Sequence, residues 1–264
     1  MNSEEIVWSQ WTRKMEHFLR LKTFPVGLKM LEDPQDLDKN PWVRRLPEKL
    51  TFCQMITIVR TFDWTVGGTA DELVPPVCAS VLGLAEIPEF VADGTMRSVV
   101  WLEKKEDAAK CERVMQRIPP GKYHAFMLAP TAYDPFVPDI VLIYGNPAQM
   151  ALMINAIQFD RYERMVFYSV GESSCSDVIA RSFVDRVPAL SIPCYGERRF
   201  GHAQDDELAI GLPTEECARI LANLETLYKR GIRYPVSQFG AQISPYDALA
   251  AVYGFPKPKA GPKP

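Results

Sequence analysis

Apolar residues recur at two different periods along this chain, and the periods separate helices from strands. Residues 3–22 place Trp8, Trp11, Met15 and Leu19 at spacings of three and four, which predicts an amphipathic helix with Ser3 as its N-cap. Other stretches carry short continuous apolar runs, which are typical of buried strands. The N-terminal stretch is therefore expected to pack one face of a helix against a core.

The remaining pattern alternates strands with helices. A first strand is expected at 25–30, followed by a Pro- and Asp-rich connection and by a helix, rather than a strand, at 52–62. Further strands are expected at 97–102, 122–129, 138–144, 165–170, 188–193 and 207–212, and further helices at 79–84, 104–118, 147–158, 175–185 and 214–230. This order predicts an α/β fold with a mixed parallel and antiparallel sheet flanked by helices.

The pattern also sets the expected domain organisation. Residues 1–250 are expected to form a single α/β domain with an N-terminal helix. Residues 251–264 alternate Pro with Lys, a composition that cannot build a core, and are expected to form a flexible tail.

Composition narrows the function classes. The 264 residues are 47% hydrophobic with a net charge of −3, which excludes a disordered chain. An isoelectric point of about 5.7 without runs of like charge argues against a general nucleic-acid binder. No apolar stretch reaches the roughly 20 residues of a transmembrane helix. From the charge and the length of the apolar stretches we expect neither a membrane nor a nucleic-acid partner. We expect a cytoplasmic location, because the first residues are acidic where a secretory signal is basic.

The chain has six cysteines, and disulfides are rare in a reducing compartment. We therefore expect each to be a buried thiol, a metal ligand or a reactive group. Cys111 and Cys217 lie in phase with the apolar stripes of their helices and are expected to be buried as small hydrophobic residues. The other four, Cys53, Cys78, Cys175 and Cys194, fall at element boundaries beside Gly, Pro, Ser or polar residues. Backbone N–H groups are free at such boundaries and can stabilise a thiolate, notably at Cys175.

Four such thiols could hold a [4Fe–4S] cluster, with zinc as the alternative metal. Their separations of 25, 97 and 19 residues include no C-x-x-C pair, so four independent buried cysteines remain an alternative. The metal ligands expected from the sequence are Cys53, Cys78, Cys175 and Cys194.

Polar residues near these cysteines suggest a pocket for a small anionic molecule. The segment after Cys194 offers an arginine fork and a histidine, between glycines. The turn at 145–149 follows an apolar strand and opens a helix, with Asn146 as N-cap, so its backbone N–H groups are available to a ligand. The candidate substrate-binding residues are Arg60, Asn146, Gln149, Arg198, Arg199 and His202.

These segments, taken in order over residues 20–230, resemble the prokaryotic family called domain of unknown function 169. The resemblance is carried by Pro25-Val26-Gly27-Leu28-Lys29, Phe52-Cys53-Gln54, Cys78, Pro138-Asp139-Ile140-Val141-Leu142, Gly145-Asn146-Pro147-Ala148-Gln149, Cys175 and Pro193-Cys194-Tyr195-Gly196-Glu197-Arg198-Arg199. It implies that the four boundary cysteines lie in the family's motif segments, and that relatives occur mainly in archaea and bacteria, many of them anaerobic. Cys78 departs from the pattern, because Ala79-Ser80 stands where relatives commonly have a Pro-Gly-Gly-like turn.

The preferred interpretation is an iron–sulfur protein of redox or carbon metabolism, an enzyme or an accessory to one, with a redox protein or a small anion as partner. If one ligand is missing, Cys78 is expected to be that one. One alternative is a metal-free binder of a small carboxylate. Another is a cysteine-dependent enzyme with Cys175 or Cys194 as nucleophile and His202 as base. The oligomeric state is left open between a monomer and a homo-oligomer.

Overall fold

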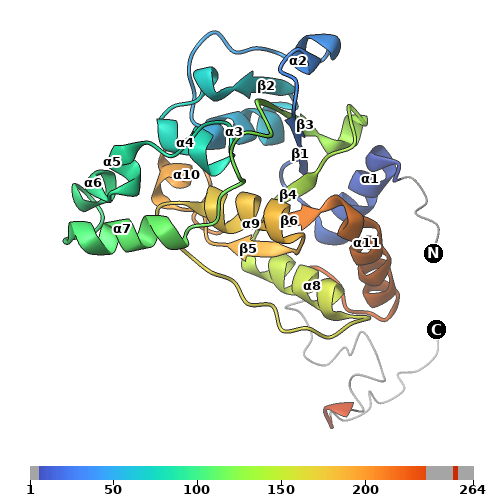
Figure 1. Ribbon diagram of the computed structural model, residues 1–264. Helices are drawn as coiled ribbons and strands as arrows, with labels where there is room; N and C mark the ends of the chain where they lie inside the picture. The colour runs from blue at the N-terminus through green and yellow to red at the C-terminus, as the bar shows by residue number, and fades with distance from the viewer. Residues whose placement is uncertain (1–5, 236–251, 255–264) are drawn as a thin grey trace, which may run out of the picture.

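A six-stranded sheet forms the centre of the computed structural model, which describes residues 6–235 and 252–254 (Figure 1). The strands lie in the order β2-β3-β1-β4-β6-β5, and every pairing between neighbours is antiparallel. Their bounds are β1 Val26–Leu31, β2 Val66–Thr69, β3 Ala125–Pro130, β4 Ile140–Gly145, β5 Ala189–Ser191 and β6 Leu208–Pro213.

The α/β class is confirmed, whereas the parallel part of the expected mixed sheet is not found between these strands. The last residue of β4, Gly145, lies opposite the first residue of β6, Leu208. Residues 146–207 therefore return the chain to the same end of the sheet, and the two strands are antiparallel. Among the described residues, parallel pairing is limited to two isolated bridges, Arg44 with Val66 and Leu50 with Leu73.

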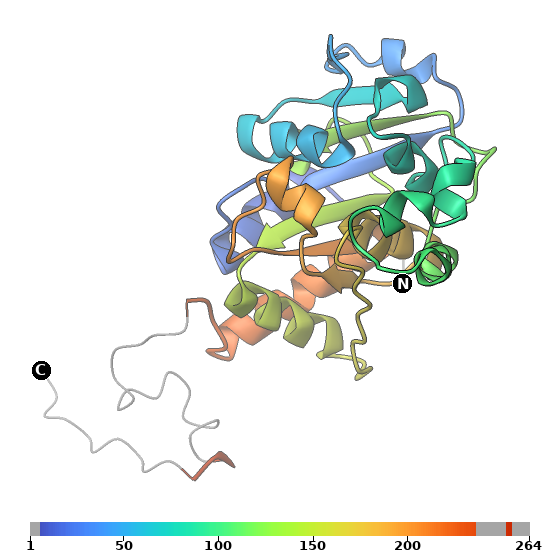
Figure 2. The ribbon, with the colours of Figure 1, turned by 90° about the vertical axis from the view of Figure 1, so that its left-hand side faces the viewer.

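The sheet separates two apolar cores, because alternate residues of a strand point to opposite faces. Leu28 and Leu142 face the first core, which is covered by α3 (Phe52–Phe62), α4 (Pro76–Val81) and the helical segment η3–α9 (Cys175–Ala180, Arg181–Asp185). Val141 and Ile143 face the second core, under α1 (Trp8–Leu19), α8 (Pro147–Gln158) and α11 (Thr214–Lys229). Figure 2 shows helices on both sides of the sheet.

Most expected helices are confirmed, with shorter bounds for several. The others are α2 Asp36–Lys39, α5 Glu89–Ala92, α6 Thr95–Ser98, α7 Lys105–Val114 and α10 Tyr195–Arg199. The segment α5–α7 projects from one side of the molecule (Figure 1). The expected N-cap Ser3 and most of the expected tail at 251–264 lie outside the described residues.

Two expected strands are wrong. Residues 97–102 contain α6 and a turn, in which Arg97 is buried while Val99 and Val100 are 77% and 69% exposed. Residues 165–170 form no strand, and Val166 and Tyr168 are more than half exposed. In both cases an apolar run that was assumed to be buried lies on the surface.

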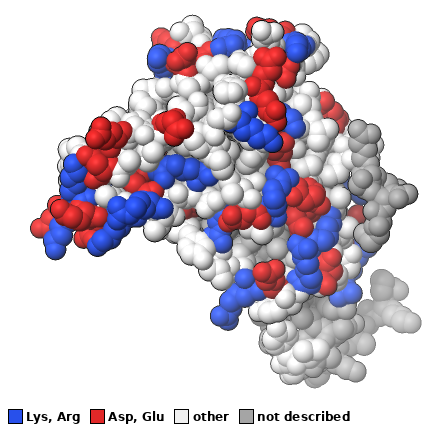
Figure 3. Space-filling model, in the orientation of Figure 1, with Lys and Arg blue, Asp and Glu red and all other residues white. Residues whose placement is uncertain are grey.

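The surface carries charges of both signs. Figure 3 shows acidic and basic side chains interspersed over one face, including the projecting α5–α7 segment. Within residues 6–235 and 252–254, no helix is long and apolar enough to cross a membrane.

Candidate cysteine site

Four of the six cysteines come from four elements that cover the same face of the sheet. Cys53 lies in the first turn of α3, Cys78 lies in α4, Cys175 begins the π-helical segment η3 and Cys194 is the N-cap of α10. Figure 2 shows α3 and α10 in front of the sheet. These are the four cysteines that the sequence singles out as candidate metal ligands.

The start of α3 positions the thiol of Cys53. Thr51 caps α3 through a capping box with Gln54, and its hydroxyl lies 3.1 Å from the Cys53 sulfur. The thiol of Cys78 donates to the Val74 carbonyl at 3.8 Å, and the backbone of Phe52, next to Cys53, partly offsets the burial that raises the pKa of Cys78.

Contacts through α10 and the turn before η3 add the other two cysteines. The thiol of Cys53 donates to the Gly196 carbonyl at 3.8 Å, and the backbone N–H of Cys194 donates to the Ser174 hydroxyl at 3.3 Å. Ser174 immediately precedes Cys175. Cys53 is thus tied to the α10 turn that Cys194 begins, and Cys194 to the residue before Cys175.

The electrostatics of the thiols reflect this arrangement. Burial, first of all, raises the pKa of Cys53 to about 12, and the charges of Glu197, Cys78 and Cys194 add to the rise. Burial also raises the pKa of Cys175 well above its usual range, with added contributions from Glu197 and the other three thiols. The expectation of a favoured thiolate at Cys175 is therefore wrong, because burial outweighs its place at a helix start.

A buried carboxyl group, Glu197, lies beside the thiols. It accepts hydrogen bonds from the hydroxyls of Tyr144 and Ser174, and burial raises its pKa. These three residues and Cys175 line an internal cavity of about 10 Å³, room for about one water molecule. Sequence reasoning missed Tyr144, whose signal is a polar tip near the end of an otherwise apolar strand.

Arg60 lies on the same side of the sheet but is already paired. Its guanidinium makes a bidentate ion pair with Glu207 at 2.8 and 2.9 Å and stacks 4.2 Å from the Tyr144 ring centre. Both side chains are buried, at 3% and 9% exposure. Burial opposes the charge, but the Glu207 hydrogen bonds outweigh it and raise the pKa of Arg60. Its charge is neutralised by the protein itself.

Asn146 and Gln149 lie apart from the cysteines, at the start of α8 on the second core. Asn146 is the N-cap of α8, as expected, and it forms a capping box with Gln149. The Gln149 amide also donates to the Leu19 carbonyl at 2.7 Å, and the Asn146 amide donates to the Tyr234 hydroxyl at 2.9 Å. Their polar groups serve the junction of α1 with α8.

Arg198, Arg199 and His202 follow Cys194 closely, but a short helix replaces the expected loop over the first two. Arg199 and His202 are exposed, and Arg198 donates to the Gln204 carbonyl at 2.7 Å. Of the six expected anion contacts, these three are the ones that follow a cysteine of the site, Cys194, within eight residues of sequence.

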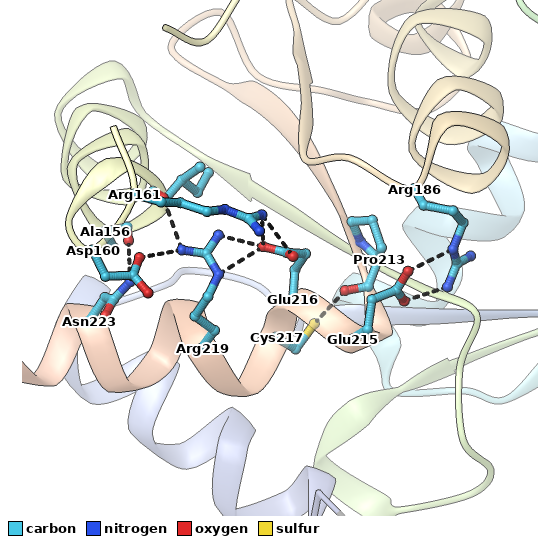
Figure 4. Close-up of polar contacts among 11 residues, drawn as sticks. Ala156, Asp160, Arg161, Arg186, Pro213, Glu215, Glu216, Cys217, Arg219 and Asn223 are labelled. Atoms are coloured by element: carbon cyan, nitrogen blue, oxygen red, sulfur yellow. Dashed lines mark hydrogen bonds and ion pairs between the residues drawn. The ribbon is translucent and has the colours of Figure 1, made fainter. Parts of the chain in front are cut away.

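Cys111 and Cys217 lie elsewhere, as their helix phase predicts. Cys217 is fully buried in the second core and donates to the Pro213 carbonyl at 3.5 Å (Figure 4). Figure 4 shows ion pairs on either side of it, which join α11 to the residues after α8, as Arg219 does with Asp160 at 2.5 Å, and to the end of α9, as Glu215 does with Arg186. Cys111 packs half-buried from α7 against the first core.

The described residues contain no group of three or more His, Cys, Asp or Glu side chains placed to hold a metal ion. Burial raises the pKa of the Cys53, Cys78 and Cys175 thiols and so favours their neutral forms. A cation among them would reverse the effect of burial, because coordination deprotonates a thiol outright.

Comparison with known proteins gives a family. Residues 14–223 match the family called domain of unknown function 169, described as "Uncharacterised ArCR". An uncharacterized protein of Methanocaldococcus jannaschii is 23% identical over 217 residues, which cover 81% of this chain and 91% of that protein. No solved structure matches the chain.

Proposed function

We propose that this chain, which belongs to the family called domain of unknown function 169, binds an iron–sulfur cluster through Cys53, Cys78, Cys175 and Cys194. A [4Fe–4S] cluster is preferred, since such clusters take four cysteine thiolates. Zinc is the alternative metal for a four-cysteine site.

The proposal rests on one observation above all. Four cysteines scattered over 142 residues of sequence come from four elements on one face of the sheet, and the charges of the other three add to the effect of burial on the pKa of Cys175. The two remaining cysteines lie elsewhere, in α7 and α11. If the six cysteines were buried independently as small hydrophobic residues, there would be no reason for four of them to gather on one face of the sheet.

The energetics of the thiols support a metal as the natural occupant. Buried thiols that lie near one another and near Glu197 resist ionisation in the metal-free protein. Metal binding would release their protons and place compensating positive charge at the centre of the group. At neutral pH the thiolate forms of Cys53 and Cys175 would then be populated only with the metal bound.

A cluster with four protein ligands would serve electron transfer or structure, whereas loss of one ligand would open an iron to substrate. Cys78 remains the ligand most open to replacement, and unlike Cys53 and Cys194 it is only partly buried. Arg198 and Arg199 would then supply positive charge for an anionic substrate beside the site. In either case we propose a role in redox or carbon metabolism in the cytoplasm, as an enzyme or as an accessory subunit.

The test is metal and sulfide analysis of full-length protein prepared without oxygen or reconstituted with iron and sulfide. The proposal predicts close to four irons and four sulfides per chain, with visible absorption that bleaches on reduction. Stoichiometric zinc without sulfide would establish the alternative metal. Less than one equivalent of either metal would contradict the proposal.

A further inference from the structure

A second site lies on the opposite face of the sheet from the cysteines. A groove of about 570 Å³ runs over β1 and β3, where α2 covers the sheet only in part. This volume falls in the range of small-molecule sites, about 300–1,000 Å³. Its lining includes Lys29, Asn40, Trp42, Met127, Pro135 and Phe136.

The walls of the groove are flat and apolar. Trp42 and Pro41 come from the turn after α2, and Phe136 comes from the loop between β3 and β4. The Trp42 side chain is 72% exposed, although burial of an indole is strongly favourable. An exposed tryptophan lining a groove with apolar neighbours is suited to stack on a planar ligand.

The two walls are held in place by hydrogen bonds. The Asn40 side chain accepts from the Trp42 backbone N–H at 3.0 Å, and its amide donates to the Pro135 carbonyl at 3.4 Å. Arg44, two residues after Trp42, donates its N–H to the Thr65 carbonyl. The groove is therefore preformed.

The floor of the groove presents the ammonium group of Lys29, whose charge is balanced by Asp139 beside it. Lys29 of β1 lies opposite Met127 of β3 and is about one-third exposed. Its ammonium donates to one oxygen of Asp139 at 2.9 Å, and the other oxygen accepts from the Met30 N–H. An ammonium has three N–H donors, so donors remain for a ligand, while Asp139 itself does not line the groove.

The rim adds little charge to that of the floor. Lys39 and Asp36 pair with each other at 2.6 Å on the exposed side of α2, so they contribute little net charge. Among the described lining residues, Lys29 is then the charged group that a ligand would meet at the floor. Its partner of choice is a carboxylate or another anionic group.

We infer that this groove binds a small organic anion with a flat aromatic part, such as an aromatic carboxylate. The ring stacks between Trp42 and the Phe136 wall, and the anionic group reaches the ammonium of Lys29. This site is separate from the proposed cluster, since Lys29 points to the face of β1 opposite Leu28 and the first core.

The test is calorimetric titration of the full-length protein with three probes: 2-naphthoate, its neutral analogue 2-naphthamide, and acetate. We expect 2-naphthoate to bind at least fivefold more tightly than 2-naphthamide, and acetate to give no measurable binding. Absence of 2-naphthoate binding, or equal binding of all three probes, would overturn the inference.

Matched variants locate the site. Trp42→Ala and Lys29→Met are each expected to weaken 2-naphthoate binding at least tenfold. Trp101→Ala, which removes another exposed tryptophan, and Lys122→Met, which removes another surface lysine, should leave it unchanged. Trp42 is exposed, so its loss does not threaten folding and the Trp42→Ala result stands even if Lys29→Met unfolds. Unchanged affinity in Trp42→Ala would contradict the proposed site.

Discussion

Gly201→Ala tests the packing that brings Cys53 close to Cys194. Gly201 is buried where the end of α10 meets α3, and its carbonyl accepts a hydrogen bond from Thr57. A methyl group at this position would lie 2.8 Å from the Glu197 carbonyl oxygen, 2.9 Å from Cβ of Cys53 and 3.1 Å from its carbonyl oxygen. Two of these atoms belong to the backbone, so a side-chain rotation cannot relieve the clash.

The magnitude follows from overpacking. One extra methyl group in a packed interior is unfavourable by about 1–3 kcal/mol. For a chain of this size, each kcal/mol lowers Tm by roughly 2–4 °C, so the metal-free variant should melt about 2–12 °C below the wild type. Because α3 and α10 must separate, Cys53 moves away from Gly196 and iron binding should fall as well.

Gly196→Ala is the matched control, since it adds the same methyl group five residues earlier. The nearest atoms there are the Cys194 sulfur at 3.8 Å and the Phe200 ring at 4.0 Å, which are ordinary contacts. Gly196 lies in α10, where alanine is favoured over glycine by up to about 1 kcal/mol. Thermal unfolding of both variants checks the reasoning, and equal Tm values for the two would refute it.

Three further predictions concern buried charges and thiols. Arg60→Met leaves Glu207 buried without its partner and should lower the free energy of unfolding by about 3–5 kcal/mol, measured in urea; a loss below about 1 kcal/mol would show that the pair behaves as a surface one. Arg97→Met should lower stability less than Arg60→Met, because the buried Glu112 keeps its ion pair with Arg117, and thermal unfolding without change would contradict this. The pKa of Cys53 is about 12 in the folded protein, against about 8.5 in an unfolded chain. The contribution of this thiol to the stability of the metal-free protein is therefore complete below about pH 8.5 and is lost as the pH rises toward 12. Cys53→Ala should therefore reduce the slope of stability against pH by about 1.4 kcal/mol per pH unit in that window, and identical slopes would count against the buried thiol.

Local signals in the sequence were sufficient for much of the fold. The helix 147–158 has the predicted bounds because Asn146 caps it and Pro147 stands at its first position, both of which act within one turn. The strands β1, β3, β4 and β6 were predicted from apolar runs that the sheet does bury. The expected strand at 97–102 failed because Val99 and Val100 are exposed while Arg97 is buried by its partner Glu112, which lies 15 residues away.

The candidate site was predictable in its members but not in its arrangement. Helix phase separated Cys111 and Cys217 from the other cysteines, because phase is a local property. The approach of Cys53 to Cys194 depends instead on how α3 and α10 cross the sheet. Similarly, nothing near Arg60 in the sequence indicates that Glu207, 147 residues later, would neutralise it.

The most direct test of the proposed cluster is the iron and sulfide content of six single variants, each replacing one cysteine by alanine under anaerobic reconstitution. Loss of Cys53, Cys175 or Cys194 should abolish or greatly reduce the visible chromophore, and loss of Cys78 should leave at most a three-cysteine cluster with altered spectrum. Loss of Cys111 or Cys217 should leave iron and sulfide at the wild-type level. Equal iron content in all six variants, or losses that do not separate four cysteines from two, would contradict the account.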